Sequence, residues 1–280
     1  MEFRILGPVE ILDGERVVPL GGLKRRAVVA ALLLHVNRVV ASEQLIDLVW
    51  GDDPPAAALG SLQNHVLRLR RELGDRLVTR PPGYLLRVET GELDLDRFRR
   101  LVEEARVSKP DEAAELLHEA LALWRGDPLA DLAGESVGAA AAHLAELRLE
   151  ALESRIDADL ALGRHANLVP ELEALVGEHP FRERLRGQLM LALYRSGRQA
   201  GALEAYSAAR TTLVEELGAE PGPPLQELQR AILRQDAKIA GPAAAVPGEP
   251  AVRIEEARKT VTRPARRPVR RAGVRSGGAA

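Results

Sequence analysis

Two adjacent stretches decide the fold: LGSLQNHVLRLRREL over residues 59–73 and RLVTRPPGYLLRV over residues 76–88. Apolar residues in the first stretch recur at steps of three and four, and because an α-helix turns by about 100° per residue they form one narrow stripe. The second stretch is typical of a short hairpin, in which Gly83 allows a tight chain reversal. We predict an amphipathic helix followed by a basic hairpin. The stripe consists of Leu59, Leu62, Val66, Leu69 and Leu73.

The opposite face of the helix carries amide, hydroxyl and guanidinium groups. These groups suit the base edges and phosphates of a DNA major groove. An ordinary solvated surface helix has the same appearance, so this face alone leaves both interpretations open. The outward residues are Ser61, Asn64, Arg68 and Arg71, flanked by Gln63, His65 and Leu67.

The residues before this helix favour DNA binding. FRILGPVEIL (3–12) and VVPL (17–20) alternate as strands do, with an Asp13-Gly14 turn between them. Residues 23–35 form a nearly all-apolar helix, and residues 41–51 form a further helix with Ser42 as its N-cap. The order of strands, three helices and a closing hairpin is that of a winged helix.

Most of the second half of the chain has helical periodicity. Two Gly-Arg pairs, at 163–164 and 197–198, stand 34 residues apart, which is the period of tetratricopeptide helix pairs. Leu172 and Tyr206 fall at matching places on the helices that follow. We predict helices near 94–107, 111–125, 136–163, 166–178, 182–196, 199–217 and 223–239.

Several long blocks resemble a known family. LGGLKRRAVVAALLL (20–34), VVASEQLIDLVWGDDPP (39–55) and TRPPGYLL (79–86) are similar to the DNA-binding half of the Streptomyces antibiotic regulatory proteins. ALALWRGDPLADL (120–132) and LMLALYRSGRQ (189–199) resemble the bacterial transcriptional activator domain that follows it in that family. The resemblance extends from residue 1 to about residue 241.

The resemblance implies a mainly α protein. We expect an α+β, OmpR-like winged helix-turn-helix over residues 1–93 and an all-α, tetratricopeptide-like helical repeat domain over residues 94–241. It also implies a pathway-specific activator of a secondary-metabolite (antibiotic) gene cluster. Such proteins bind direct repeats in double-stranded promoter DNA and recruit RNA polymerase holoenzyme, and we expect a homodimer on DNA.

Individual roles follow from residue chemistry. An outward Arg68 can pair bidentately with guanine, with about 1–3 kcal/mol of discrimination. Arg70 lies near the apolar stripe and is expected at a phosphate on the rim of the groove, whereas His65 suits either a phosphate contact or inert packing. Tyr84 is expected in the core. With Lys24 and Arg26, to which the resemblance points as phosphate contacts, the candidate DNA-binding residues are Lys24, Arg26, Ser61, Asn64, His65, Arg68, Arg70, Arg71, Thr79 and Arg80.

Charge is distributed unevenly along the 280 residues, although the net charge is only −2. Residues 1–90 carry +1, residues 91–241 carry −9 and residues 242–280 carry +6. The middle segment repels a polyphosphate, so DNA affinity has to come from the first segment and the tail. We expect residues 242–280 to be a disordered basic tail, which either adds non-specific DNA affinity or is a harmless extension.

Other classes of function lack support in the sequence. There is no cysteine, no P-loop, no GxGxxG, no HExxH and no GxSxG, and the six histidines lack metal-ligand spacing. We therefore expect no enzyme, no cofactor and no metal. No apolar run reaches the roughly 20 residues of a membrane span, and no signal peptide is evident, so we expect a cytoplasmic, nucleoid-associated protein. A protein-interaction adaptor and a ligand-sensing regulator are the alternatives.

Overall fold

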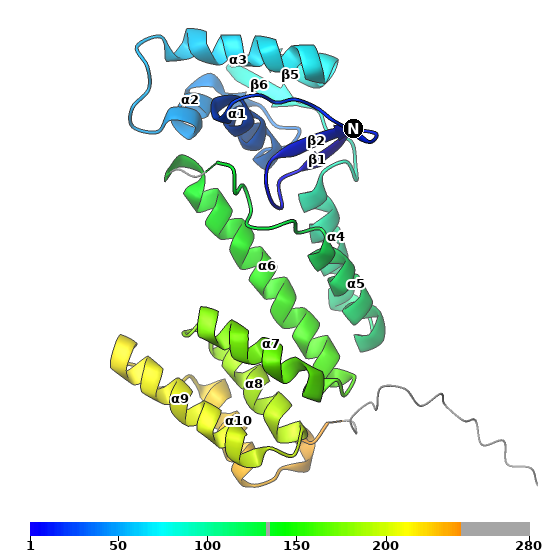
Figure 1. The fold of residues 1–280 in the computed structure, drawn as a ribbon, viewed down its shortest axis with the longest axis vertical. Coiled ribbons are helices and arrows are strands. Elements are labelled where there is room, and N and C mark those ends of the chain that lie inside the picture. The colour runs from blue at the N-terminus through cyan, green and yellow to red at the C-terminus, as the bar shows by residue number, and fades with distance from the viewer. Residues whose placement is uncertain (133–134, 242–280) are drawn as a thin grey trace, which may run out of the picture. The chain divides into compact units, whose positions relative to one another are not determined.

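The computed structural model describes residues 1–132 and 135–241, and the described part is mainly helical with small sheets near its N-terminus (Figure 1). This confirms the predicted fold class. The N-terminal elements are β1 (Glu2–Arg4), β2 (Glu10–Asp13), β3 (Arg16–Val17), α1 (Leu23–Leu34), β4 (Val40–Ala41), α2 (Ser42–Trp50), α3 (Ala58–Leu73), η1 (Gly74–Arg76), β5 (Leu77–Arg80) and β6 (Gly83–Leu86). The C-terminal elements are α4 (Asp94–Val107), α5 (Pro110–Ala122), α6 (Glu135–Ala161), α7 (His165–Glu178), α8 (Glu183–Arg195), α9 (Gln199–Leu217), α10 (Pro223–Leu233) and η2 (Ala237–Ile239).

Two three-stranded antiparallel sheets flank the first three helices. One sheet has the order β1-β2-β3 and the other the order β4-β6-β5. Residues 27–33 of α1 are all buried, which places this helix at the centre of the winged helix (Figure 1). The predicted order of strands, three helices and hairpin is therefore present.

Three details of the sequence prediction are wrong. Ser42 is not an N-cap: Ala41 occupies that position without a side-chain cap, and the Ser42 hydroxyl donates to the Pro82 carbonyl oxygen at 3.2 Å. Leu59 is 51% exposed, because the first turn of α3 extends beyond the core and the buried stripe begins only at Leu62.

The third detail is Gly83. The chain reverses at Pro81-Pro82, while Gly83 lies within β6, opposite Arg80 in β5 and Ala41 in β4. A Cβ atom at Gly83 would lie 1.9 Å from the Val40 carbonyl oxygen. Glycine is therefore required by the close approach of β4 rather than by the turn.

We expect Gly83→Ala to lower the free energy of unfolding by about 1–3 kcal/mol or more, since a backbone atom of β4 has to move. Gly60→Ala is the matched control, because Gly60 lies in α3 with open space where its Cβ would be. This control should raise the free energy of unfolding by about 0.5–1 kcal/mol. Urea titrations measure both values, and equal effects of the two substitutions would contradict the account.

The helical part follows the predicted order. The structure confirms the predicted helices 94–107 and 199–217, and Leu172 and Tyr206 are both buried on their helices. The last helix was predicted to reach residue 239 but ends at Leu233. Gln235 adopts a φ of 52°, which α-helical geometry does not allow.

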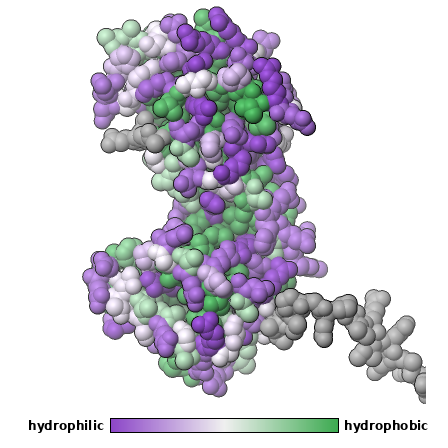
Figure 2. All heavy atoms as spheres, viewed as in Figure 1, coloured by the Kyte–Doolittle hydropathy of each residue, from purple (hydrophilic) through white to green (hydrophobic). Residues whose placement is uncertain are grey.

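Two clusters of buried apolar residues fill the interior. One begins at Phe3 and continues through the three-helix region into α4, α5 and α6, and the other fills the space between α6 and α10. Hydrophobic residues gather midway along the view in Figure 2, where α6 runs in Figure 1. The predicted boundary between residues 93 and 94 remains a prediction, and the basic tail lies outside the described residues. Among the described residues, no helix combines the length and apolar character of a membrane span.

Buried and half-buried carboxylates join the N-terminal strands to α4. Asp94 is 2% exposed and accepts hydrogen bonds from the backbone N–H groups of Ile5 and Leu6 at 2.9–3.0 Å. Burial raises the pKa of Asp94, and these N–H donors oppose that rise. Two residues earlier, Glu92 accepts from the Arg76 guanidinium at 2.6 and 2.9 Å and from the Met1 ammonium at 3.2 Å.

Glu92 supplies a pH-dependent contribution to stability. Burial alone would raise its pKa, but Arg76, the Glu89 N–H and the Met1 ammonium together lower it from 4.5 to about 2. A depressed pKa of an acid stabilises the folded state above the unfolded-state pKa, and that stabilisation is lost as the pH falls towards the folded-state pKa.

We therefore expect wild type to be more stable than Glu92→Gln by about 3 kcal/mol at most at pH 7. The difference should shrink as the pH falls from about 5 to about 2. Chemical unfolding at a series of pH values measures it. Glu89→Gln removes the same charge at an exposed position, so its stability difference from wild type should not vary with pH in this way. If the difference between wild type and Glu92→Gln did not vary with pH, the lowered pKa of Glu92 would not contribute to stability as described.

Candidate nucleic-acid interface

Helix α3 presents a polar face because its apolar stripe is fixed inward. Leu62, Val66, Leu69 and Leu73 are each at most 3% exposed. On the opposite side Asn64 and Arg68 are exposed, and Ser61 is half-buried. Leu67, which the sequence placed outward, is 53% exposed.

A groove of about 720 Å³ lies between this face and the first turn of α1. The structure thus brings Lys24 together with four candidates that lie about forty residues further along the chain. All charged residues that line the groove are basic. The lining consists of Gly22, Leu23, Lys24, Arg25, Ser61, Asn64, His65 and Arg68.

A contact chain through Trp50 fixes α1, α2 and α3 relative to one another. The Lys24 ammonium donates to the carbonyl oxygen of Val49 at 2.6 Å and lies 5.7 Å from the centroid of the Trp50 ring. The other partner of Trp50 is His65, whose ring is stacked on it with centroids 5.9 Å apart and planes at 28°. Lys24 therefore combines a cation–π contact with a place at the groove.

The pKa of His65 is lowered by its place in the groove. Burial lowers its pKa below 6.5, and the neighbouring charges of Arg25, Arg68 and Lys24 lower it further. The imidazole is therefore neutral at pH 7, with one nitrogen able to donate and the other able to accept a hydrogen bond.

Arg26 is not among the residues that line the groove. Its guanidinium forms an ion pair with Asp131 from the segment between α5 and α6, and its Nε donates to the Gly21 carbonyl oxygen at 3.3 Å. Arg25, which the sequence analysis did not include among its candidates, lines the groove instead. Local sequence cannot separate these adjacent arginines, because Asp131 reaches Arg26 from 105 positions further along the chain.

The hairpin is held against α3 by Arg70. Its Nε donates to the Leu77 carbonyl oxygen at 3.1 Å, and its terminal nitrogen donates to the Thr79 hydroxyl at 2.7 Å. Arg71, in the last turn of α3, and Arg80, beside the hairpin turn, are exposed. Tyr84 is 7% exposed, which confirms its expected place in the core.

The interface has the composition of an anion-binding surface. Lys24, Arg25 and Arg68 meet at the groove, and within residues 1–132 and 135–241 none of them forms an ion pair with an acidic side chain. The described residues also contain no group of three or more His, Asp or Glu side chains arranged to hold a metal ion.

We expect Arg68→Ala to raise the pKa of His65 towards 6.5, because one of the cations that oppose its protonation is removed. An NMR titration of the imidazole resonances measures this value. Arg71→Ala is the control, since Arg71 is not among the groups that shift His65. An unchanged pKa in Arg68→Ala, or an equal rise in both variants, would show that the groove does not act on His65 as described.

Comparison with known families identifies both parts of the chain. Residues 19–86 match the family described as "Transcriptional regulatory protein, C terminal", and residues 93–233 match the "Bacterial transcriptional activator domain". The first match covers the candidate interface from α1 to the hairpin, and the second covers the helices from α4 to α10.

Individual relatives are named as regulators rather than enzymes. The regulatory protein DnrI of Streptomyces peucetius is 45% identical over 257 residues, which span 85% of this chain and 94% of DnrI. The regulatory protein AfsR of Streptomyces griseus is 44% identical over 87% of this chain, but the chain spans only 26% of AfsR. The structure of Mycobacterium tuberculosis EmbR, in complex with a low-affinity phosphopeptide, has a TM-score of 0.79 and 39% identity, covering 84% of this chain and 65% of EmbR.

Proposed function

We propose a DNA-binding function for this chain, which belongs to the Streptomyces antibiotic regulatory protein family of transcriptional regulators. One observation carries the proposal. The polar face of α3 and the first turn of α1 share a groove whose charged residues are all basic, and Arg68, Asn64 and Ser61 are among the residues that line it. A helix with such a face fits the major groove of B-DNA, which is about 12 Å wide.

Base recognition is assigned to α3. Arg68 donates to the O6 and N7 atoms of guanine, and Asn64 suits the N6 and N7 atoms of adenine. The neutral His65, held against Trp50, adds one donor and one acceptor at the edge of the same face. Leu67 is exposed and contacts a thymine methyl group.

Phosphate contacts surround this face. The first turn of α1 has no side-chain cap, and we assign a DNA phosphate to its first N–H groups, those of Leu23 and Lys24, together with the side chains of Lys24 and Arg25. Arg71 and Arg80 supply phosphate contacts from the end of α3 and from the hairpin. Arg70 positions the hairpin through Thr79, and Arg26, already paired with Asp131, links the DNA-binding region to the segment before α6.

The remaining functions are assigned to the helical part. Residues 91–241 carry a net charge of −9, so they are repelled by DNA and suit contacts with protein partners. We propose that this part activates transcription by recruiting RNA polymerase holoenzyme. Copies of the chain bind direct repeats in a promoter, and direct repeats require a head-to-tail rather than a two-fold arrangement. Membership of the Streptomyces antibiotic regulatory protein family supports genes for a secondary metabolite as the target.

We expect Arg68→Ala to weaken binding to the promoter DNA of the neighbouring genes by about fivefold to 150-fold, since a bidentate guanine contact provides about 1–3 kcal/mol. Electrophoretic mobility shifts at two salt concentrations, with shuffled DNA of equal length as competitor, measure it. Arg99→Ala removes the same charge from the exposed face of α4 and should leave the affinity unchanged.

Binding is sequence-specific if the complex with promoter DNA persists at the higher salt concentration while the complex with shuffled DNA does not. Equal, salt-sensitive retention of promoter and shuffled DNA by wild type would mean that the arginines act only as a polyelectrolyte. A loss of affinity caused equally by Arg68→Ala and Arg99→Ala would also mean that the arginines act only through their charge.

A further inference from the structure

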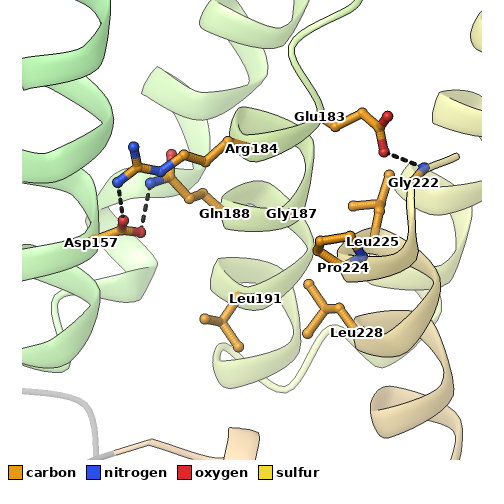
Figure 3. A pocket seen from close by; sticks show the side chains of 10 residues that line it. All are labelled: Asp157, Glu183, Arg184, Gly187, Gln188, Leu191, Gly222, Pro224, Leu225 and Leu228. Carbon is orange, nitrogen blue, oxygen red and sulfur yellow. Dashed lines mark hydrogen bonds and ion pairs between the residues drawn. The ribbon is translucent and has the colours of Figure 1, made fainter.

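A second pocket lies far along the chain from the proposed DNA-binding residues. It has a volume of about 580 Å³ and is formed by α8 with side walls from α6 and the start of α10 (Figure 3). This volume falls within the roughly 300–1,000 Å³ of small-molecule sites. The proposed DNA-binding function does not use this pocket.

The floor of the pocket is a bare stretch of helix at Gly187. In Figure 3, Gly187 lies between the side chains that face α6 and those that belong to α10. A Cβ atom at Gly187 would make only ordinary contacts, 3.6 and 3.8 Å from methyl groups of Leu225 and Leu228. The space above the helix is thus open because residue 187 lacks a side chain, and its walls are mainly apolar, with Leu191, Pro224 and Leu228 among them.

The polar groups on the α6 side satisfy one another, apart from one oxygen. Arg184 donates to Asp157 at 2.7 Å, and the Gln188 side-chain N–H group donates to Asp157 at 2.6 Å and to the Glu153 carbonyl oxygen at 2.8 Å. Gln188 is 4% exposed, yet its side-chain oxygen has no hydrogen-bond partner within the described residues. A buried acceptor without a donor is unfavourable, because it has lost its hydrogen bonds to water.

On the side next to α10, the pocket is lined by the Glu183 carboxylate. Glu183 accepts a hydrogen bond from the Gly222 N–H at 2.7 Å but forms no ion pair with any described residue. The nearby cation Arg186 donates instead to the Pro180 carbonyl oxygen at 2.7 Å. Two carboxylates and one guanidinium line the pocket, which gives it a formal charge of −1.

The pocket therefore combines an apolar surface with one carboxylate, Glu183, that forms no ion pair with any described residue. We propose that this pocket binds a small apolar molecule that carries an ammonium group, with the apolar body over Gly187 and the ammonium at Glu183. The Glu183–Gly222 hydrogen bond bridges α8 and α10 at one end, and Leu191 and Leu228 lie towards the other, which favours a compact ligand over a peptide (Figure 3).

The test uses the full chain and a defined probe, dansylcadaverine, which joins an apolar fluorophore to a primary ammonium. We expect a saturable rise and blue shift of its emission with wild type. N-acetyl-dansylcadaverine, which lacks the charge, should bind about twofold to fivefold more weakly, as for a partly exposed ion pair.

Two matched pairs of variants locate the site. Gly187→Leu fills the pocket and should abolish binding, whereas Gly177→Leu, in α7 with open space at its Cβ, should bind as wild type does. Glu183→Gln keeps the acceptor for Gly222 and should lose the preference for the charged probe. Glu227→Gln, at an exposed position of α10, should retain it. Thermal unfolding followed by circular dichroism shows that each variant is folded.

Four results would overturn the proposal. They are the absence of saturable binding to wild type, equal binding to folded Gly187→Leu, equal affinity for both probes, and a preference that survives Glu183→Gln. If Gly187→Leu instead dissociates a dimer in sedimentation, the pocket is a contact between copies. If a peptide of alternating Leu and Lys binds in a Gly187-dependent manner and dansylcadaverine does not, the pocket receives a protein segment.

Discussion

Burial of the apolar stripe of α3 is the constraint on which the proposed interface depends. Leu62, Val66, Leu69 and Leu73 lie against the core of the winged helix, and each contributes about 1.5–3 kcal/mol when removed from water. Rotating the helix would expose these residues, so the rotation is fixed and the direction of the polar face follows from it. Arg70 and the contacts through Trp50 then hold the hairpin and α1 beside that face. Stability and the proposed DNA contacts thus depend on opposite sides of one helix.

The sequence was most informative where periodicity is regular. Apolar spacing shows which face of a helix is buried. It therefore predicts the helices 94–107 and 199–217 and the buried stripe of α3 from Leu62 onward. The sequence was less informative where a distant part of the chain decides the local arrangement. Asp131 pairs with Arg26 while Arg25 lines the groove, and the phosphate contact expected of Arg26 stays a prediction. Strand β4 approaches Gly83 so closely that a glycine first assigned to a turn lies within a strand. Residues 242–280 and their expected role lie outside the described residues.

The two parts of the chain differ in how their charges are distributed. Basic residues gather at α1, α3 and the hairpin, while the helical part is acidic and pairs many of its arginines internally, as Arg155 does with Asp159 and Glu171. Asp94 and the Arg26–Asp131 pair join the two parts with short-range polar contacts. A change in the helical part therefore has a direct structural path to α1, next to the proposed phosphate site. Leu225 belongs to the second apolar cluster and also lines the pocket at Gly187. Helix α6 contributes Asp157 to the wall of the same pocket.

The most direct test of the central claim asks whether Arg68 contacts a guanine base. Affinity is measured for wild type and Arg68→Ala on promoter DNA, with each guanine of the binding site replaced in turn by 7-deazaguanine, which lacks the N7 acceptor. At one position the base change should weaken wild type by about tenfold and leave Arg68→Ala unaffected, because the contact is already absent. If every replacement weakens both proteins equally, Arg68 does not contact a guanine N7, and the proposed placement of α3 in the major groove is contradicted.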